Sequence, residues 1–292
     1  MKPLALNTPL NITLHIALTL TFIFINIGSA YAIKIIPPRL VIDSDIKVQH
    51  LFIKNDEETT QGYRFGWKHL AMAKDGSIVN VDKLGRDKVP EYKAADDLIR
   101  FSPRRVTLKP GQTQRITMML RRSPNLEAGE YRSHFLIQRE PQSTTAEVTS
   151  SENPQQQGAT VGVDVLISRA IPIYVLHGKT NASLELLNAS YKPNLNKTRP
   201  NQPSHVVHFD VKKTGNRSVI GVANIHCDDS GNNKRLNKVG KVFAVYAEGE
   251  FGKQKMAVDF PPNACSNMKI VITGHRDGQL AGQILAERAL QR

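Results

Sequence analysis

Cysteine is scarce in this sequence, with only Cys227 and Cys265 among 292 residues, so at most one disulfide can form within the chain. Aromatic residues make up 6%, and the basic residues are scattered along the chain. Both features disfavour nucleic acid as a partner. Acidic residues are in deficit as well, because the formal net charge is +13. This charge indicates acidic or carboxylate-bearing partners, or simply solubility.

Long apolar runs are absent except at the start, where residues 12–27 are almost entirely apolar. Lys2 precedes the run, and the triplet Ala30-Tyr31-Ala32 follows it. A positive start, an apolar run and a small-x-small triplet predict a cleavable signal peptide over residues 1–32. A membrane anchor is the alternative, but the run is short for crossing a bilayer. The remainder of the chain is therefore expected to be exported and soluble.

Export bears on the oxidation state of the two cysteines. In an oxidising compartment, an isolated pair such as Cys227 and Cys265 predicts one disulfide bond, and two buried free thiols are the alternative. Residues 33–292 are long enough for two domains of ordinary size, each able to bury a core.

Short strand patterns separated by turn residues recur along the first half. Apolar and β-branched residues fill segments 48–53, 63–70, 104–108, 115–120 and 131–138. Lys109-Pro110-Gly111 is typical of a turn, because proline presets φ and glycine accepts positive φ. The two prolines of the opening segment, residues 33–43, mark an edge strand or a strand start. Strands of this length and spacing predict an all-β fold of antiparallel sandwiches.

Residues 139–160 are polar and nearly devoid of large apolar side chains, which predicts a long loop that is disordered or functional. Directly after it, residues 161–175 carry β-branched apolar side chains at nearly every odd position. This period of two predicts a strand. The simplest interpretation gives it one face in its own core. Its length suggests in addition that it protrudes from its domain or bends at Pro172.

The predicted domains are residues 33–177, including the loop and the long strand, and residues 178–292. Strand patterns in the second domain cover 206–212, 219–225, 239–247 and 268–273. The tail, residues 280–292, is expected to form a short amphipathic helix or to fray.

Motifs of catalysis are missing. The sequence contains no G-x-S-x-G, H-E-x-x-H, Walker loop or C-x-x-C motif. His205 and His208, with His226 and Cys227, raise the alternative of a metal site, but strand residues three apart face opposite sides. We therefore expect no enzyme, cofactor, metal or small-molecule substrate.

Several strings resemble the periplasmic chaperones that assemble pili with an outer-membrane usher. FSPRRVTLKPGQTQR (residues 101–115) and GEYRSH (residues 129–134) carry the resemblance in the first domain. It is extended by IPPR (residues 36–39), YRFGW (residues 63–67) and, more loosely, KTGNRS (residues 213–218). The resemblance implies two immunoglobulin-like domains, location in the periplasm, and pilus or fimbrial subunits and an usher as partners.

The resemblance also implies a mechanism. A pilus subunit lacks one strand of its sandwich and exposes an apolar groove, and the chaperone lends an edge strand to fill it. In this chain the donor strand would be residues 161–167, with Val161, Val163, Val165 and Ile167 entering the groove. The free strand edge would also permit self-association.

The family further implies a basic pair between the domains that holds the terminal carboxylate of the subunit. Arg39 matches the arginine of this pair. The position of the partner lysine is occupied by Pro172, so Arg169, the nearest basic residue, is the expected substitute. A solvated surface charge is the alternative for each arginine.

Two other functions compete with this interpretation. A secreted adhesin or structural sandwich would bind through loops, because sandwiches host many functions. A hydrolase is disfavoured by the lack of a nucleophile and base.

Overall fold

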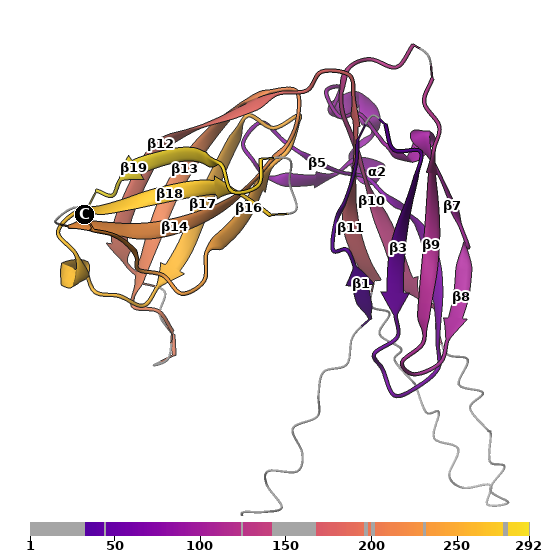
Figure 1. The fold of residues 1–292 in the computed structure, drawn as a ribbon, viewed down its shortest axis with the longest axis horizontal. Coiled ribbons are helices and arrows are strands. Elements are labelled where there is room, and N and C mark those ends of the chain that lie inside the picture. The colour runs from indigo at the N-terminus through magenta and orange to yellow at the C-terminus, as the bar shows by residue number, and fades with distance from the viewer. Residues whose placement is uncertain are drawn as a thin grey trace, which may run out of the picture.

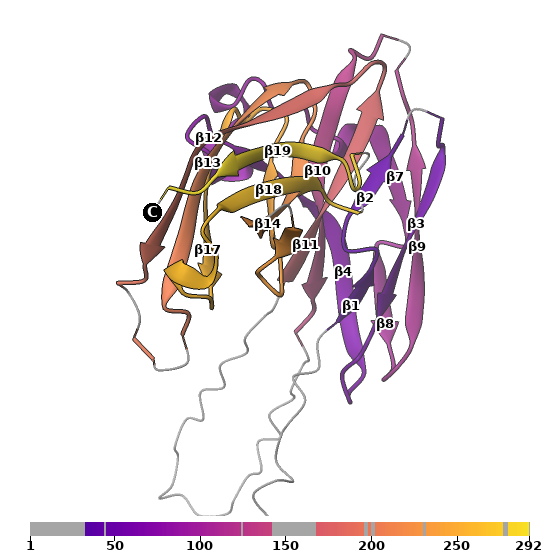
Figure 2. The same ribbon diagram turned by 60° about the vertical axis from the view of Figure 1, so that its left-hand side comes forward.

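The structure is a computed structural model that describes residues 33–43, 45–123, 125–141, 168–195, 198–199, 202–229, 232–276 and 280–291. The predicted signal peptide, residues 142–160 of the predicted loop and residues 161–167 of the predicted donor strand lie outside the described residues. Two β-rich lobes meet at an angle (Figure 1), and Figure 2 shows the same two lobes from a second side.

The first lobe is a sandwich of two sheets. One sheet has the order β1 (Lys34–Ile36), β3 (Val48–Lys54), β9 (Thr113–Leu120) and β7 (Ile99–Ser102). The other has the order β2 (Leu40–Ile42), β11 (Ser168–His177), β10 (Gly129–Arg139), β4 (Gln61–Lys68) and β8 (Arg105–Leu108). This division of strands is that of an immunoglobulin-like sandwich.

Alternation of side chains builds the core of this lobe. Along β3, Leu51 and Ile53 are fully buried, while Phe52 between them is 41% exposed. The same period of two places Phe135 and Ile137 of β10 in the core cluster. Gly111 takes a φ of 73° between β8 and β9, as the predicted turn requires.

The opening segment is divided between the two sheets. β1 pairs antiparallel with β3, and β2 pairs parallel with β11. Pro37 and Pro38 stand between β1 and β2. Because proline has no N–H to donate to a ladder, the chain leaves one sheet there and enters the other.

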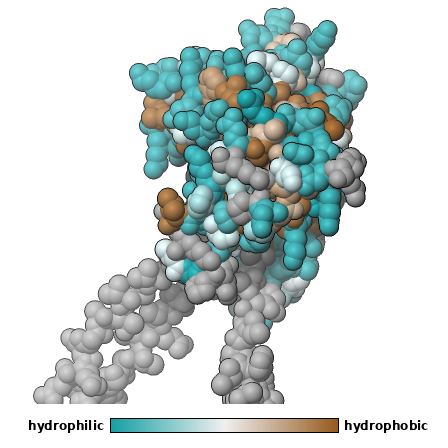
Figure 3. All heavy atoms as spheres, turned by 90° about the vertical axis from the view of Figure 1, so that its left-hand side faces the viewer, coloured by the Kyte–Doolittle hydropathy of each residue, from teal (hydrophilic) through white to brown (hydrophobic). Residues whose placement is uncertain are grey.

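The second lobe is also a sandwich. One sheet has the order β12 (Ala182–Pro193), β13 (His205–Gly215) and β17 (Phe251–Val258). The other is centred on β14 (Val219–Asp229), which pairs with β15 (Asn232–Arg235), β16 (Lys241–Val245) and β18 (Met268–Gly274). The short helix η4 (Pro262–Ala264) precedes β18. The face of this lobe in Figure 3 is mainly hydrophilic, with apolar side chains in separate spots.

The prediction for the tail is wrong. Instead of a helix or a frayed end, residues 284–289 form β19 (Ile284–Ala289), which pairs with β18. Gln291 continues the closure, because its N–H donates to the carbonyl of Ala189 and its carbonyl accepts from the N–H of Tyr191. The sandwich is thereby closed between β18 and β12.

A small insertion joins the lobes. It contains β5 (Leu70–Met72), β6 (Ile78–Asn80), α2 (Val81–Leu84), η2 (Arg86–Lys88) and η3 (Asp96–Leu98). Figure 1 places β5 and α2 at the junction. The side chain of Met72 belongs to the second lobe's core cluster, although the residue lies in the first half of the chain.

Among the described residues, no helix is long and apolar enough to cross a membrane.

Candidate polypeptide-binding site

β11 pairs unequally on its two sides. Its full length, residues 168–177, pairs with β10. On the other side, β2 pairs only with residues 173–175. Within the described residues, the edge of β11 that faces β2 therefore has no strand partner over residues 168–172. Pairing with β10 runs through Pro172 without interruption.

The predicted donor strand, residues 161–167, directly precedes this edge in the sequence. Val161, Val163, Val165 and Ile167 lie outside the described residues, and the last of them directly precedes Ser168, the first residue of β11. An edge with unpaired backbone groups can accept a further strand.

The two faces of β11 have different surroundings. Ile171, Ile173 and Val175 belong to the core of the first lobe. Pro172 and Tyr174 alternate with them and therefore lie on the opposite face of the sheet, where the hydroxyl of Tyr174 interacts electrostatically with Tyr246 of the second lobe. We call this outer face of the five-stranded sheet the cleft face.

The structure does not bring the two predicted anchor arginines onto the same face. Leu40 and Ile42 of β2 are buried in the core, so alternation places Arg39 on the cleft face. Its charge acts there on the hydroxyls of Tyr174 and Tyr246. Arg169 shares the core-facing parity of Ile171, at the far end of the sandwich. Its guanidinium donates to the carbonyl oxygen of Ile33 at 2.6 Å.

A buried charge network fills the cleft face where the lobes touch. Arg132, 2% exposed, donates to both carboxylate oxygens of Glu248 at 2.6 and 3.1 Å. The guanidinium also lies 3.6 Å from the ring centroid of Tyr246. Both partners come from the second lobe, and a fork-to-fork pair fixes orientation as well as contributing energy.

A second carboxylate belongs to the same network. Glu130 accepts hydrogen bonds from the backbone N–H of Ser218 at 2.7 Å and from the hydroxyl of Ser218. Burial raises the pKa of the Glu130 carboxyl, although Arg132, 3.8 Å away, opposes this. The network therefore ties β10 to the start of β14.

His134 completes the polar row of β10. It is 4% exposed and lies against the ring of Tyr246, with 6.2 Å between centroids. Burial, followed by the charge of Arg132, lowers the pKa of the imidazole to about 3. Within the described part of the chain, its Nδ1 atom has no hydrogen-bond partner. The imidazole is thus neutral at physiological pH.

A histidine holds the insertion in place. The Nδ1 atom of His69 lies 2.5 Å from the Asp82 carboxylate, and Nε2 lies 3.0 Å from Asp96. The hydrogen bond to Asp96 is the main cause that raises the pKa of His69. Ser133 donates its hydroxyl proton to Asp96 and not to the histidine. This arrangement is structural and does not form a nucleophile–base pair.

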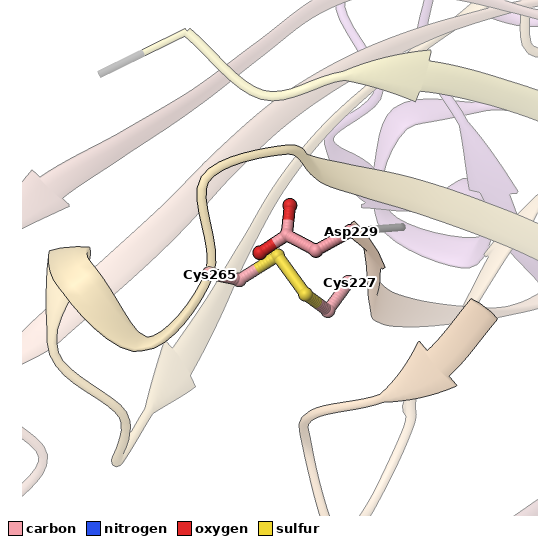
Figure 4. A group of neighbouring side chains, drawn as sticks. All are labelled: Cys227, Asp229 and Cys265. Atoms are coloured by element: carbon pink, nitrogen blue, oxygen red, sulfur yellow. A yellow bond between two sulfur atoms is a disulfide. The ribbon is translucent and has the colours of Figure 1, made fainter. Parts of the chain in front are cut away.

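The predicted disulfide between Cys227 and Cys265 is confirmed. Figure 4 shows it beside the Asp229 carboxylate. Asp229 accepts hydrogen bonds from the backbone N–H groups of Ser266 and Asn267, both at 2.9 Å. Although the three side chains cluster closely, the sulfur atoms are bonded to each other, so no thiolate is offered to a metal.

The sequence prediction missed Glu130, Arg132, His134 and Glu248. A signal was present, because polar residues occupy positions 130, 132 and 134 of β10 while Tyr131, Phe135 and Ile137 occupy odd ones. On one strand this pattern is typical of a solvent face. The second lobe buries that face, which the pattern of a single strand does not reveal.

No family model matches the sequence, and no curated protein matches it. Solved structures similar to this chain include the class 5 fimbriae chaperone CfaA, at 17% identity, covering 89% of this chain and 100% of that chain with a TM-score of 0.43. The CsuC–CsuE chaperone–tip adhesion subunit pre-assembly complex, from the archaic chaperone–usher Csu pili of Acinetobacter baumannii, matches at 12% identity, 89% and 98% coverage, and TM-score 0.44. The E. coli chaperone DraB matches at 8% identity, 89% and 96% coverage, and TM-score 0.43. With TM-scores below 0.5, these similarities carry no functional conclusion for this chain.

Proposed function

We propose that this chain is a periplasmic chaperone that captures pilus or fimbrial subunits by strand donation and delivers them to an outer-membrane usher. The observation that carries the proposal is the one-sided pairing of β11 over residues 168–172, directly after the apolar alternation of residues 161–167. A partner that lacks a strand would pair with this edge and receive the apolar side chains in its groove.

Burial of four apolar side chains would be a main source of binding energy for capture. Full burial of one such side chain contributes roughly 1.5–3 kcal/mol, so Val161, Val163, Val165 and Ile167 together would contribute about 6–12 kcal/mol before the cost of ordering. Backbone pairing would add to this energy and set the direction of the donated strand relative to the strands of the partner. The charge anchor remains part of the proposal: Arg39 is suitably placed on the cleft face, whereas Arg169 would first have to release the carbonyl of Ile33.

Substitution of Val165 by aspartate tests the donor strand. A charge entering an apolar groove is strongly unfavourable, so we expect Val165→Asp to abolish soluble capture of co-exported subunits. Leu166→Asp is the matched control, because alternation along a donated strand would turn residue 166 away from the groove, so capture should persist. Co-purification from periplasmic extracts is the measurement. Retained capture by a folded Val165→Asp protein would contradict the assignment.

The same assay separates the proposal from the loop-binding alternative. An adhesin that binds through residues 139–160 should lose its ligand when the tip of that loop is deleted. A chaperone that donates residues 161–167 should keep its subunit.

A further inference from the structure

The outer face of the four-stranded sheet in the first lobe exposes four neighbouring apolar side chains. Alternation along β3 turns Val48 and Phe52 outward, at 47% and 41% exposure. The register places Ile36 of β1 beside Phe52 and Met119 of β9 beside Val48, and both neighbours are also 47% exposed. Together they form an oblique apolar band across β1, β3 and β9. Apolar side chains that gather in this way mark an interaction site more often than ones scattered singly.

Arginine and lysine side chains flank the apolar band. Arg115 of β9 is the partner of Phe52 in the sheet register, and Arg100 of β7 is the partner of Met119. Lys34 stands at the start of β1, at the end of the sheet. All three cationic side chains are exposed. Positive charge therefore lies beside the band and beyond one end of it.

Carboxylates are missing from the strands that form this face. The outward positions of the four strands, all of which the structure describes, are Lys34, Ile36, Val48, His50, Phe52, Lys54, Arg100, Ser102, Thr113, Arg115, Thr117 and Met119. We call this set the back face. At its margin, Lys54 pairs with Asp56, which follows the end of β3, at 2.5 Å. The back face thus combines apolar area with a net positive charge.

The back face and the cleft face belong to different sheets of the same sandwich. Figure 2 shows β3, β7 and β9 on the side of the first lobe that lies away from the second lobe. The cleft face is the outer face of the other sheet, so the two faces are back to back. A contact made by the back face would therefore leave the cleft face open to a partner.

We infer that the back face docks on the surface of an anionic lipid bilayer. The apolar band would enter the boundary between headgroups and acyl chains, while the cations would contact headgroup phosphates. Anionic headgroups can move laterally to meet cations spread over several strands, whereas a folded acidic protein would have to match each position. The predicted signal segment, residues 1–32, directly precedes β1, so export would deliver this sheet at a membrane.

Co-flotation with vesicles tests the inference on the exported chain. One set of vesicles is phosphatidylcholine alone, and the other is equal parts phosphatidylcholine and phosphatidylglycerol. We expect the wild-type protein to associate with the anionic vesicles at least about tenfold more strongly than with the neutral ones. The preference should shrink as the salt concentration rises, because ions screen the attraction between the cations and the headgroups.

Substitutions on the back face locate the contact. Phe52→Thr should weaken association with the anionic vesicles about fivefold, because a half-exposed ring no longer becomes buried in the lipid. The double variant Lys34→Gln with Arg115→Gln should weaken it at least about tenfold, because two cations near the headgroups are lost. These side chains are exposed, so an unchanged urea midpoint should show that both variants remain folded.

The second lobe offers matched controls for both changes. Phe251 of β17 is 36% exposed, and Lys253 and Lys255 are exposed on the same strand. Phe251→Thr should associate with the anionic vesicles like wild type. The double variant Lys253→Gln with Lys255→Gln should lose much less association than the double variant of the back face.

Fluorescence shows which side of the molecule enters the lipid. Phe52→Trp places an indole in the apolar band, whereas the native Trp67 packs against Phe101 and Phe135 in the first lobe and supplies a constant background. Anionic vesicles with brominated acyl chains should quench the added indole. The same vesicles should not quench the indole of Phe251→Trp.

Three results would overturn the inference. These are failure of the wild type to float with anionic vesicles, unchanged flotation of both back-face variants, and quenching of Phe251→Trp but not of Phe52→Trp. Retention on immobilised poly-glutamate without flotation, if lost in the double variant of the back face, would replace the bilayer with an acidic protein partner. Docking is independent of strand donation, so Val165→Asp should float like wild type, and loss of its flotation would place the contact elsewhere.

Discussion

Side chains of β10 alternate between the core of the first lobe and the contact with the second lobe. Tyr131, Phe135 and Ile137 fill the core of the first lobe, and the intervening Glu130, Arg132 and His134 form the polar contact with the second lobe. A strand buried on both faces is usually apolar throughout. Here the second face is polar because it is an interface, and each polar group needs a specific partner to offset its desolvation.

His134 gives the protein a measurable dependence on pH. Its folded-state pKa, about 3, lies below its ordinary value of 6.5. Below pH 6.5, the unfolded chain therefore binds a proton that the folded chain does not, and stability falls as pH drops toward 3. From this group alone, the free energy of unfolding should be about 2 kcal/mol lower at about pH 5 than at about pH 8.

Urea unfolding of wild type and His134→Gln across this range checks the prediction. The difference between the two proteins isolates His134 from His69, whose raised pKa acts in the opposite direction. His69 contributes stability below its ordinary pKa and loses that contribution as pH rises through the folded value. Parallel pH curves for wild type and the variant would contradict the assignment of a buried neutral His134.

The sequence predicted some residues of the cleft face and not others. Arg39 was expected on the cleft because its string matched a known pattern, and the cysteine pair was expected from its isolation. His134 shows only the polar alternation of β10, and its neighbours on the cleft face come from strand register across β2, β11, β10 and β4. Register depends on contacts between distant segments, which one strand pattern does not encode.

At the scale of elements, clean alternation identified most of the strands. β3, β4, β8, β10, β13 and β18 lie within a few residues of the predicted segments. β19 was missed because Ile284–Ala289 contains alanine, glutamate and arginine, which favour helices. Its strand conformation comes from pairing with β18, so tertiary context overrides local propensity. The insertion was missed because its elements are only three or four residues long.

Removal of β19 should damage the second lobe. Leu285, Ala286 and Leu290 pack against the core, and Arg288 donates to the carbonyl of Leu186 on β12. Truncation before residue 284 would expose the edge of β18. It should lower the free energy of unfolding by about 1–3 kcal/mol from the two leucines alone, because both are only partly buried. Urea unfolding and light scattering are the measurements, with aggregation expected from the open edge.

A point substitution in the same strand controls for the truncation. Ile284 is 66% exposed, so Ile284→Ser should change stability by less than about 0.5 kcal/mol. If the truncated protein kept the wild-type midpoint and stayed monodisperse, β19 would not be closing the sandwich in solution.

At the scale of the whole molecule, binding of a partner depends on the angle between the two lobes, because a partner paired with β11 must also fit beside the second lobe. The buried network and the insertion both set that angle. Arg132 reaches across to Glu248, Glu248 accepts from the backbone N–H of Met72 in the insertion at 2.7 Å, and Glu130 accepts from Ser218. Arg132 is therefore the cation paired directly with the two buried carboxylates at the junction, and the buried ammonium of Lys213 also acts on both.

Arg132→Met tests whether this network makes the lobes a single cooperative unit. The substitution keeps much of the side-chain volume but removes the guanidinium that pairs directly with Glu130 and Glu248, which should cost about 3–5 kcal/mol. Because the carboxylates can regain water only if the lobes separate, we expect calorimetry to show two unfolding transitions where wild type shows one, and small-angle scattering to show a wider range of lobe angles. Arg100→Met, at an exposed arginine of β7, is the matched control and should behave like wild type. A single transition at the wild-type midpoint in Arg132→Met would mean that apolar packing, such as Met72 in the second core, holds the lobes together without the ion network.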